Sequence, residues 1–317
     1  MTISHQRRSR FAVLLLFMGF AISPGSRAQD SAVPPGVPAS INPALVTPAS
    51  SSSSPSNLIS DNPVQASPQQ PNVDIPLQLG PKQLTNFVEA GSDYLGLDNN
   101  FGSWAGGYAR GVVTKGSNIW SAEVNGQREF GDAGVYFAAG DTYNFNPDWY
   151  GSATVGSSVG GFFWPRFRAD GFINKKWMAR KQLITTFGLG YYAAKDVHRD
   201  HSFFAGSTYY FAKPWILEEG IRFNVSNPGS VFSPAGFVAV TQGRNQRHSL
   251  TFRAGFGKEA YQLVGPTVTL TDFDSQTFTF TWRQWLGTNW GINMVGDSYH
   301  SPFYARGGAS FGFFREF

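Results

Sequence analysis

The chain ends on an aromatic residue, inside a run in which phenylalanines alternate with other residues. Phe311, Phe313 and Phe317 have the same parity, so in a β-strand they point to one face and form an apolar stripe. A terminal strand of this kind is typical of bacterial outer-membrane β-barrels, where it closes the barrel against the first strand. Arg315 interrupts the stripe, and its long stem can carry the charge to the lipid head groups. A soluble β-sandwich that ends on phenylalanine is the alternative.

Transmembrane helices are excluded by the absence of long apolar runs. Beyond residue 28, no such run approaches the roughly 20 residues that a membrane-spanning helix needs. If the mature chain spans a membrane, only a closed barrel can satisfy its backbone hydrogen bonds in lipid. An aromatic content of 16% and 36 glycines fit this class, because rings build interfacial girdles and glycine permits bends and close packing. We therefore expect an all-β, antiparallel, up-and-down transmembrane barrel at residues 83–317.

Segments with β character follow one another from about residue 84, separated by Gly, Pro, Asn and Asp. Apolar and polar residues alternate most clearly in 249–257 and 277–285. A soluble sandwich has the same period, but here the segments are uniformly long and their polar face carries Arg and Glu in mid-strand. We expect 12–14 strands, because single-chain bacterial barrels have an even number. The fourteen candidates are 84–95, 102–114, 117–129, 131–145, 147–160, 166–176, 181–195, 200–212, 215–227, 234–243, 247–258, 274–285, 289–299 and 303–317.

The amino-terminal part has the composition of an export signal and a linker. Residues 1–28 combine Arg7, Arg8 and Arg10 with a short apolar core and small residues before Gln29, which predicts a secretory signal peptide. Residues 29–82 are rich in Pro, Ser and Ala and predict a disordered periplasmic linker. A plug in the lumen, or a tether for a periplasmic partner, is the alternative for this segment.

The net charge and the lack of cysteine restrict the function classes. Four of the 25 basic residues lie in 1–28, which holds no acidic residue, so 21 basic and 21 acidic residues remain. The balance gives no support to nucleic-acid binding. The chain has no cysteine, hence no lipidated cysteine and no disulfide framework.

With both chain ends in the periplasm, the strand connections fall into two groups. Short turns at 115–116, 213–214 and 287–289 would face the periplasm. Longer connections at 195–200, 227–234 and 258–272 would face outward, as extracellular loops do.

Charged residues on the polar parity form a candidate lumen wall. If they point inward, the wall is rich in arginine with a few carboxylates, and it could hold or pass anionic solutes because guanidinium binds carboxylate and phosphate in a bidentate way. A self-paired network that fills and rigidifies a narrow barrel is the other interpretation. The candidates are Glu123, Arg128 or Glu129, Arg166, Arg168, Asp170, Arg222, Arg253, Arg283 and Arg306.

The sequence predicts no catalytic, cofactor or metal site, and we expect a protein that is not an enzyme. His198 and His201 flank Arg199 and Asp200, but this spacing without a third histidine is a weak metal motif. His248 and His300 each precede a serine, and strand neighbours point to opposite faces, so neither pair shares a proton. A candidate site for stacking sugar rings comprises Asp148, Trp149, Tyr150, Trp164, Trp177 and Trp215, and interfacial girdles are the alternative for its aromatic residues.

The chain resembles the YaiO-type outer-membrane barrel family. The motifs that carry the resemblance are Arg-Glu-Phe-Gly at 128–131, Asp-Trp-Tyr at 148–150, Trp-Pro at 164–165, Gly-Leu-Gly-Tyr-Tyr at 188–192, Tyr-Tyr at 209–210 and Ser-Asn-Pro-Gly at 226–229.

The resemblance implies an outer-membrane location and a narrow channel or structural barrel, with an association with envelope polysaccharide export. The expected partners are outer-membrane lipid, the barrel assembly machinery through the terminal strand, and polysaccharide synthesis or export proteins. An enzyme acting on lipid or glycan, or a binding scaffold that uses its loops, is the alternative.

Overall fold

The computed structural model describes residues 86–317, except 100, 212–213, 245–246 and 265–268, and every element in this part is a β-strand. The predicted signal peptide at 1–28 and the predicted linker at 29–82 lie outside the described residues. The strands are β1 (Phe87–Leu97), β2 (Ser103–Lys115), β3 (Asn118–Glu129), β4 (Asp132–Asn144), β5 (Trp149–Gly160), β6 (Phe167–Trp177), β7 (Leu183–Ala193), β8 (Arg199–Tyr210), β9 (Trp215–Asn227), β10 (Val231–Arg244), β11 (His248–Leu263), β12 (Thr269–Trp285), β13 (Trp290–His300) and β14 (Ala305–Glu316).

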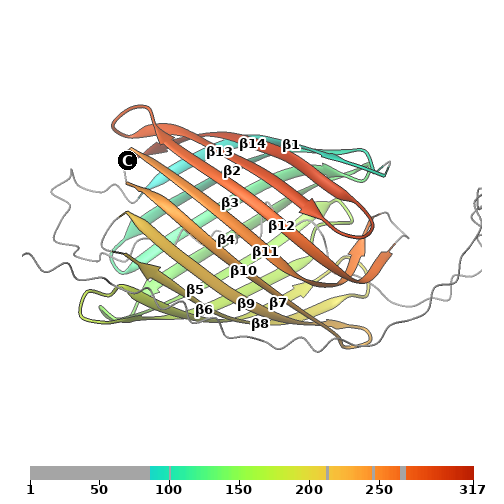
Figure 1. Cartoon of the computed structure of the whole chain (residues 1–317), viewed down its shortest axis with the longest axis horizontal. Coiled ribbons are helices and arrows are strands. Elements are labelled where there is room, and N and C mark those ends of the chain that lie inside the picture. The colour runs from blue at the N-terminus through green and yellow to red at the C-terminus, as the bar shows by residue number, and fades with distance from the viewer. Residues whose placement is uncertain (1–85, 100, 212–213, 245–246, 265–268) are drawn as a thin grey trace, which may run out of the picture. The chain divides into compact units, whose positions relative to one another are not determined.

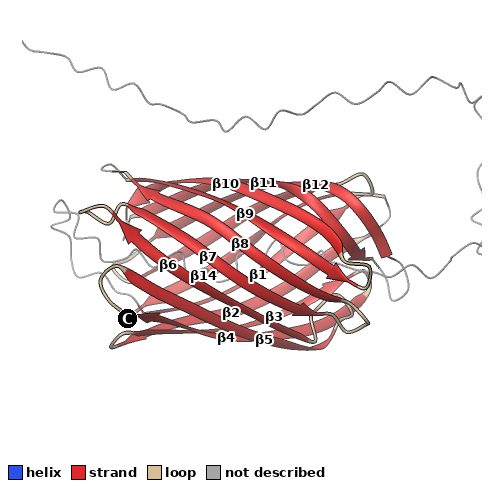
Figure 2. Ribbon diagram, turned by 90° about the horizontal axis from the view of Figure 1, so that it is seen from below, coloured by secondary structure: helices blue, strands red, loops and turns tan. Residues whose placement is uncertain are grey.

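The fourteen strands form one closed antiparallel barrel in which each strand pairs with its sequence neighbours (Figures 1 and 2). β14 closes the barrel against β1, with Glu316 opposite Phe87 and Arg306 opposite Leu97. The backbone N–H of Phe317 adds a hydrogen bond of 3.0 Å to the carbonyl of Asn86. The predicted fold class is therefore confirmed, at the upper limit of the expected strand number. No helix in the described residues is long and apolar enough to cross a membrane.

The first residue of β1 and the last residue of β14 lie at the same end of the barrel, marked by the C-terminus in Figures 1 and 2. We call this the terminal end and the other the distal end. Connections are short at both ends, for example 116–117 and 145–148 at the terminal end and 130–131 and 161–166 at the distal end. The predicted contrast between short periplasmic turns and long outward loops is wrong.

The largest error concerns the expected loop at 258–272. Residues 258–263 continue β11 and residues 269–272 begin β12, so these two strands extend farther than the others. The extension is held at the distal end by side chains of other hairpins. The Tyr299 hydroxyl lies 2.8 Å from Glu259 Oε1, and the Tyr261 hydroxyl donates a hydrogen bond of 3.3 Å to the Pro228 carbonyl. In the other two expected loops, residues 199–200 belong to β8 and residues 231–234 to β10.

Strict alternation separates an apolar outer face from a polar inner face. On β1, Glu89 and Asp93 are buried inside the barrel, whereas Val88 and Tyr94 are exposed outside it. Outward side chains at mid-strand are apolar, as Val155 and Phe187 illustrate. This is the arrangement that a barrel needs in order to contact lipid outside and water or polar side chains inside.

Outward tryptophans gather at the terminal end of the barrel. The exposed ones are Trp120, Trp149, Trp177, Trp215 and Trp290, each near the strand end on that side. The Lys175 amine lies 3.7 Å from the centre of the Trp177 ring and 5.0 Å from that of Trp149. Tryptophan and lysine at this level are typical of a lipid–water interface. Trp149, Trp177 and Trp215 thus occupy girdle positions, whereas Trp164 is buried at the distal end and stacks on Tyr136 at 5.1 Å.

Candidate functional site

Charges of alternating sign follow one hydrogen-bonded row across the inner wall. Glu89 on β1 lies opposite Arg110 on β2, which lies opposite Glu123 on β3. The same row continues through Ala138 and Gly156 to Arg168 on β6. It begins near the terminal end on β1 and reaches the distal end on β6, because the strands are tilted (Figure 1). The row therefore forms a slanting polar path along the length of the lumen.

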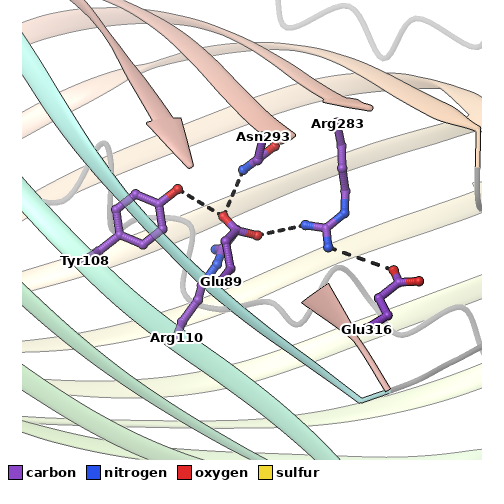
Figure 3. Close-up of polar contacts among 6 residues, drawn as sticks. All are labelled: Glu89, Tyr108, Arg110, Arg283, Asn293 and Glu316. Atoms are coloured by element: carbon purple, nitrogen blue, oxygen red, sulfur yellow. Dashed lines mark hydrogen bonds and ion pairs between the residues drawn. The ribbon is translucent and has the colours of Figure 1, made fainter. Parts of the chain in front are cut away.

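Glu89 is the hub of the charge network (Figure 3). Its side chain is fully buried, and its Oε1 atom accepts hydrogen bonds from the Tyr108 hydroxyl at 3.0 Å, Arg110 Nη2 at 2.8 Å and Asn293 Nδ2 at 3.1 Å. Its Oε2 atom accepts one from Arg283 Nη1 at 2.8 Å. Charge-assisted bonds of this kind are the strongest in proteins, and together they compensate the desolvation of the buried carboxylate.

Two inner-wall arginines lie over an aromatic ring. The guanidinium carbon of Arg283 is 3.5 Å from the centre of the Phe314 ring, and that of Arg253 is 3.6 Å from the centre of the Phe237 ring. Each ring lies in turn over an inner-wall glycine: a Cβ atom at Gly291 would come within 2.7 Å of Phe314, and one at Gly220 within 2.8 Å of Phe237. Glycine, ring and guanidinium thus form a three-layer stack against the wall, with cation–π attraction between the upper layers.

Other aromatic rings of the inner wall approach a glycine in the same way but have no arginine guanidinium over them. A Cβ atom at Gly188 would lie 2.3 Å from Cδ1 of Phe172, and one at Gly156 would overlap Tyr136. In each case the large side chain lies along the wall, over a position that has no side chain. Glycine in a strand often marks such a close approach. The rings therefore occupy little of the space near the barrel axis.

At the distal end, part of the lumen is sealed. Arg306 Nη2 lies 3.1 Å from Asp297 Oδ1, and these two side chains are 1% and 3% exposed. The Arg306 guanidinium lies 4.5 Å from the centre of the Trp104 ring. Trp104, Phe130, Phe101, Tyr304 and Tyr299 pack in sequence, with ring centres 5.1 to 6.0 Å apart. We call these five rings the distal cap.

The wall around β6, β8 and β9 is more open. Arg168 Nε donates a hydrogen bond of 2.6 Å to Asp170 Oδ2, while Arg222 Nη1 is 3.9 Å from Asp170 Oδ1 and 3.3 Å from Ser202 Oγ. The Arg222 side chain is 32% exposed although it points into the barrel. It lies 5.9 Å above the centre of the Phe204 ring, another ring that covers inner-wall glycines.

Hydroxyl groups line the wall beside this open sector. The hydroxyls of Thr241 and Thr251 are 2.8 Å apart and face the same inner surface. The register places further serines and threonines on that surface, and all of them keep partial exposure: Ser249, Ser275, Thr277, Thr279 and Thr281. The inner face of β10–β12 is therefore hydrophilic without a dense charge network.

The sequence-derived lumen residues fall into two groups. The structure places seven of them on the inner wall: Glu123, Arg168, Asp170, Arg222, Arg253, Arg283 and Arg306. Arg166 is different, because it lies in the connection before β6 and is exposed at the distal end. Of the pair left open, Glu129 is buried inside and Arg128 is exposed outside.

Reasoning from sequence missed half of the network. The overlooked inner-wall residues are Glu89, Asp93, Tyr108, Arg110, Glu218, Asn293, Asp297 and Glu316. With these residues included, the inner-wall residues named here comprise eight carboxylates and six arginines, so the wall is not dominated by arginine. Parity was the available signal, since Glu89 and Asp93 alternate with outward Val88 and Tyr94 in the first strand.

The aromatic residues of the terminal strand lie on the outer face. Phe311 and Phe313 contact each other edge to face, with ring centres 4.9 Å apart, and both are exposed, as is Phe317. They adjoin β1, where Phe313 lies opposite Ala90. The outward stripe therefore crosses the junction between the first and last strands.

The histidines are placed apart from the charge network. His198 is buried in the connection before β8, where its Nδ1 atom lies 2.6 Å from Asp196 Oδ2. His201 lies in β8 and points outward, with its ring centre 5.2 Å from that of Tyr191. In the described part of the chain, no group of three or more His, Asp or Glu side chains has the geometry of a metal site.

Comparison with known proteins agrees with the fold. The model of the YaiO membrane beta barrel domain matches residues 85–262. The CymD monoaromatic hydrocarbon channel superposes with a TM-score of 0.51 at 8% identity, over 80% of this chain and 92% of that chain. The TodX deltaS2S3 mutant monoaromatic hydrocarbon channel gives 0.50 at 10% identity, over 73% and 90%. The Pseudomonas putida toluene transporter TodX gives 0.49 at 12% identity, over 73% and 89%. No curated protein matches the chain.

Proposed function

The chain belongs to the YaiO membrane β-barrel family, and from its inner wall we propose that this outer-membrane barrel is a narrow channel for small polar solutes. The proposed path follows the open sector along β8–β12. It runs beside Arg222 and the hydroxyl groups of the inner wall, away from the hub at Glu89 and the sealed pair of Arg306 and Asp297.

The contrast in exposure between inner-wall arginines is the observation that carries the proposal. Arg306 on β14 is 1% exposed beneath the distal cap, whereas Arg222 on β9 is 32% exposed. Side chains in a lumen packed solid would all resemble Arg306. The close approach of rings to inner-wall glycines supports the same conclusion, because it keeps bulky groups near the wall.

Single-channel recording in planar lipid bilayers tests the channel. We expect discrete current steps from the purified full chain in potassium chloride. Replacement of Thr279 on the inner face of β12 by Trp should reduce the step size, while replacement of Phe278, its outward neighbour, by Trp should not. A barrel that inserts and shows the heat-modifiable gel shift, yet carries no current at any voltage, would contradict the proposal.

A closed structural barrel is the second candidate. It is favoured by the hub at Glu89 and by the distal cap, which fill one side of the lumen. A silent but correctly folded barrel in the recordings is the result that this candidate predicts.

The proposal includes a non-catalytic role and an association with envelope polysaccharide, which the family resemblance suggests. Incubation of the purified chain with labelled lipopolysaccharide and phospholipid should release no fatty acid. Deletion of the gene should lower the amount of polysaccharide at the cell surface. Fatty-acid release would instead favour an enzyme acting on lipid, and an unchanged polysaccharide level would remove the association.

A further inference from the structure

Arg222 has hydrogen-bonding capacity that its protein contacts leave unused. A guanidinium carries five N–H donors. Within the described residues, the hydrogen bonds and ion pairs of Arg222 involve Nη1 alone, to Ser202 at 3.3 Å and Asp170 at 3.9 Å. Asp170 is already bonded to Arg168 at 2.6 Å, so it neutralises Arg222 only in part. The Nε and Nη2 donors of Arg222 are therefore available to a solute in the lumen.

The other ion-paired arginines of the wall are less suited to binding a solute. Arg283 and Arg110 are both bonded to Glu89 at 2.8 Å, and their side chains are 19% and 26% exposed. Arg306 is sealed beneath the distal cap. Arg222 is more exposed than any of them, and its nearest carboxylate partner lies farther away, at 3.9 Å.

The surroundings hold Arg222 in place and add polar groups. Phe204 lies below the guanidinium and over Gly206 and Gly220, where a Cβ atom would come within 2.7 Å of the ring. Asn224, two positions along on the same face, lies opposite Ser202 on β8 and Ser233 on β10. The guanidinium therefore lies over the Phe204 ring and beside hydroxyl and amide groups that can form hydrogen bonds with the hydroxyls of a solute.

We propose that Arg222 binds the carboxylate of a small hydroxylated organic acid as the solute moves along the lumen, an inference that rests on the proposed channel. The planar fork of a guanidinium matches a carboxylate in a bidentate way. A dianionic phosphate fits less well, because it would meet one available guanidinium and the nearby carboxylate of Asp170. The neutral groups around Arg222 account for the preference for a hydroxylated solute.

Binding of D-glucuronate to the detergent-solubilised full chain, measured by equilibrium dialysis, tests the site directly. Arg222→Gln should weaken binding by about tenfold or more, the effect of losing a charge-assisted hydrogen bond. Arg222→Lys keeps the positive charge without the planar guanidinium, so its affinity for glucuronate should lie between those of the unaltered protein and Arg222→Gln. Arg315→Gln, on the outer face of β14, should bind as the unaltered protein does. Equal binding by Arg222→Gln, or equal binding of D-glucose or inorganic phosphate, would overturn the proposal.

Recordings on the same variants separate this inference from the channel itself. In the unaltered protein, glucuronate should shorten the open time or reduce the size of the current steps in potassium chloride, and Arg222→Gln should abolish this effect. If the barrel conducts but glucuronate does not change the current, the proposed anion site is contradicted and the proposed channel is supported. If the barrel never conducts but Arg222→Gln loses glucuronate binding, the proposed channel is contradicted and the proposed anion site is supported. The heat-modifiable gel shift shows that each variant is folded.

Discussion

Glu89 on β1 and Arg283 on β12 meet at 2.8 Å although their strands are not neighbours and the residues lie 194 positions apart in the chain. β13 and β14 lie between them in the barrel wall, and both side chains reach across on the inner face (Figure 3). The contact therefore joins the beginning of the barrel to its end by a route other than the β1–β14 hydrogen bonds.

Replacement of Glu89 by Gln should destabilise the barrel by about 3–5 kcal/mol, because Arg110 and Arg283 would lose their shared carboxylate in a buried site. The midpoint of the heat-modifiable gel shift, together with urea unfolding in lipid vesicles, measures the effect. Arg315→Gln is the matched control on the outer face. A Glu89 variant as stable as the control would show that the hub contributes no net stability.

Replacement of Gly188 by Ala should displace the Phe172 ring, because the new Cβ atom would lie 2.3 Å from Cδ1 of that ring. We expect a loss of stability of about 1–3 kcal/mol, as for overpacking in a core. Gly296→Ala is the control, since a Cβ atom there has no neighbour within 4 Å, and its effect should stay within about 0.5 kcal/mol. Urea unfolding of both variants should separate them. Equal stability would mean that the ring moves without cost.

The stability of the distal end should fall in acid because of His198. Burial lowers the pKa of this imidazole, the Asp196 carboxylate opposes that shift, and the Arg199 charge adds to it. A folded-state pKa below the unfolded value means that the unfolded chain binds the proton more readily. Stability is therefore lost as the pH falls below about 6.5, the ordinary histidine pKa.

Proteolysis of the 194–198 connection at pH 8 and pH 5 measures this effect. The cleavage rate should rise at pH 5 in the unaltered protein and rise less in His198→Asn. Cleavage rates with the same pH dependence in both would contradict the role of His198.

Replacement of Val155 by Arg should destabilise the barrel by about 2–4 kcal/mol, the cost of a cation at mid-membrane on the lipid face. Val155 is outward and lies near the middle of β5. Val88 is also outward but lies near the beginning of β1, so Val88→Arg should cost only about 0–1 kcal/mol. Urea titration in phospholipid vesicles compares the two. Equal costs would indicate that the outer face is not in lipid.

The fold was accessible from sequence because it depends on local regularities. Alternation and segment length predict strands one at a time, and each strand pairs with its neighbour in the chain, so the order follows without long-range information. The region 258–272 failed because its strand pairing extends beyond the rest of the barrel. Contacts such as Tyr299 with Glu259 hold it there, and no periodicity in the sequence signals them.

Only about half of the residues in the charge network could be predicted from the sequence, for a related reason. Parity identifies which face a residue occupies, and it worked for Arg283 and Arg222. It does not show that Arg283 reaches Glu89 two strands beyond its own neighbour, because that contact depends on the tilt of the strands. Arg166 has the inward parity of Arg168 but falls just outside β6, where the wall ends.

The arrangement around Glu89 has a consequence for assembly. Its partners come from the second, twelfth and thirteenth strands, so the carboxylate can be satisfied only when the polypeptide has curled into a full ring. An unfinished sheet would keep the Glu89–Arg110 pair of the first hairpin, but it would lack the contacts of Glu89 with Arg283 and Asn293. The contacts of Glu89 with Arg283 and Asn293 therefore stabilise the closed cylinder relative to intermediates in which the last strands are not yet in place.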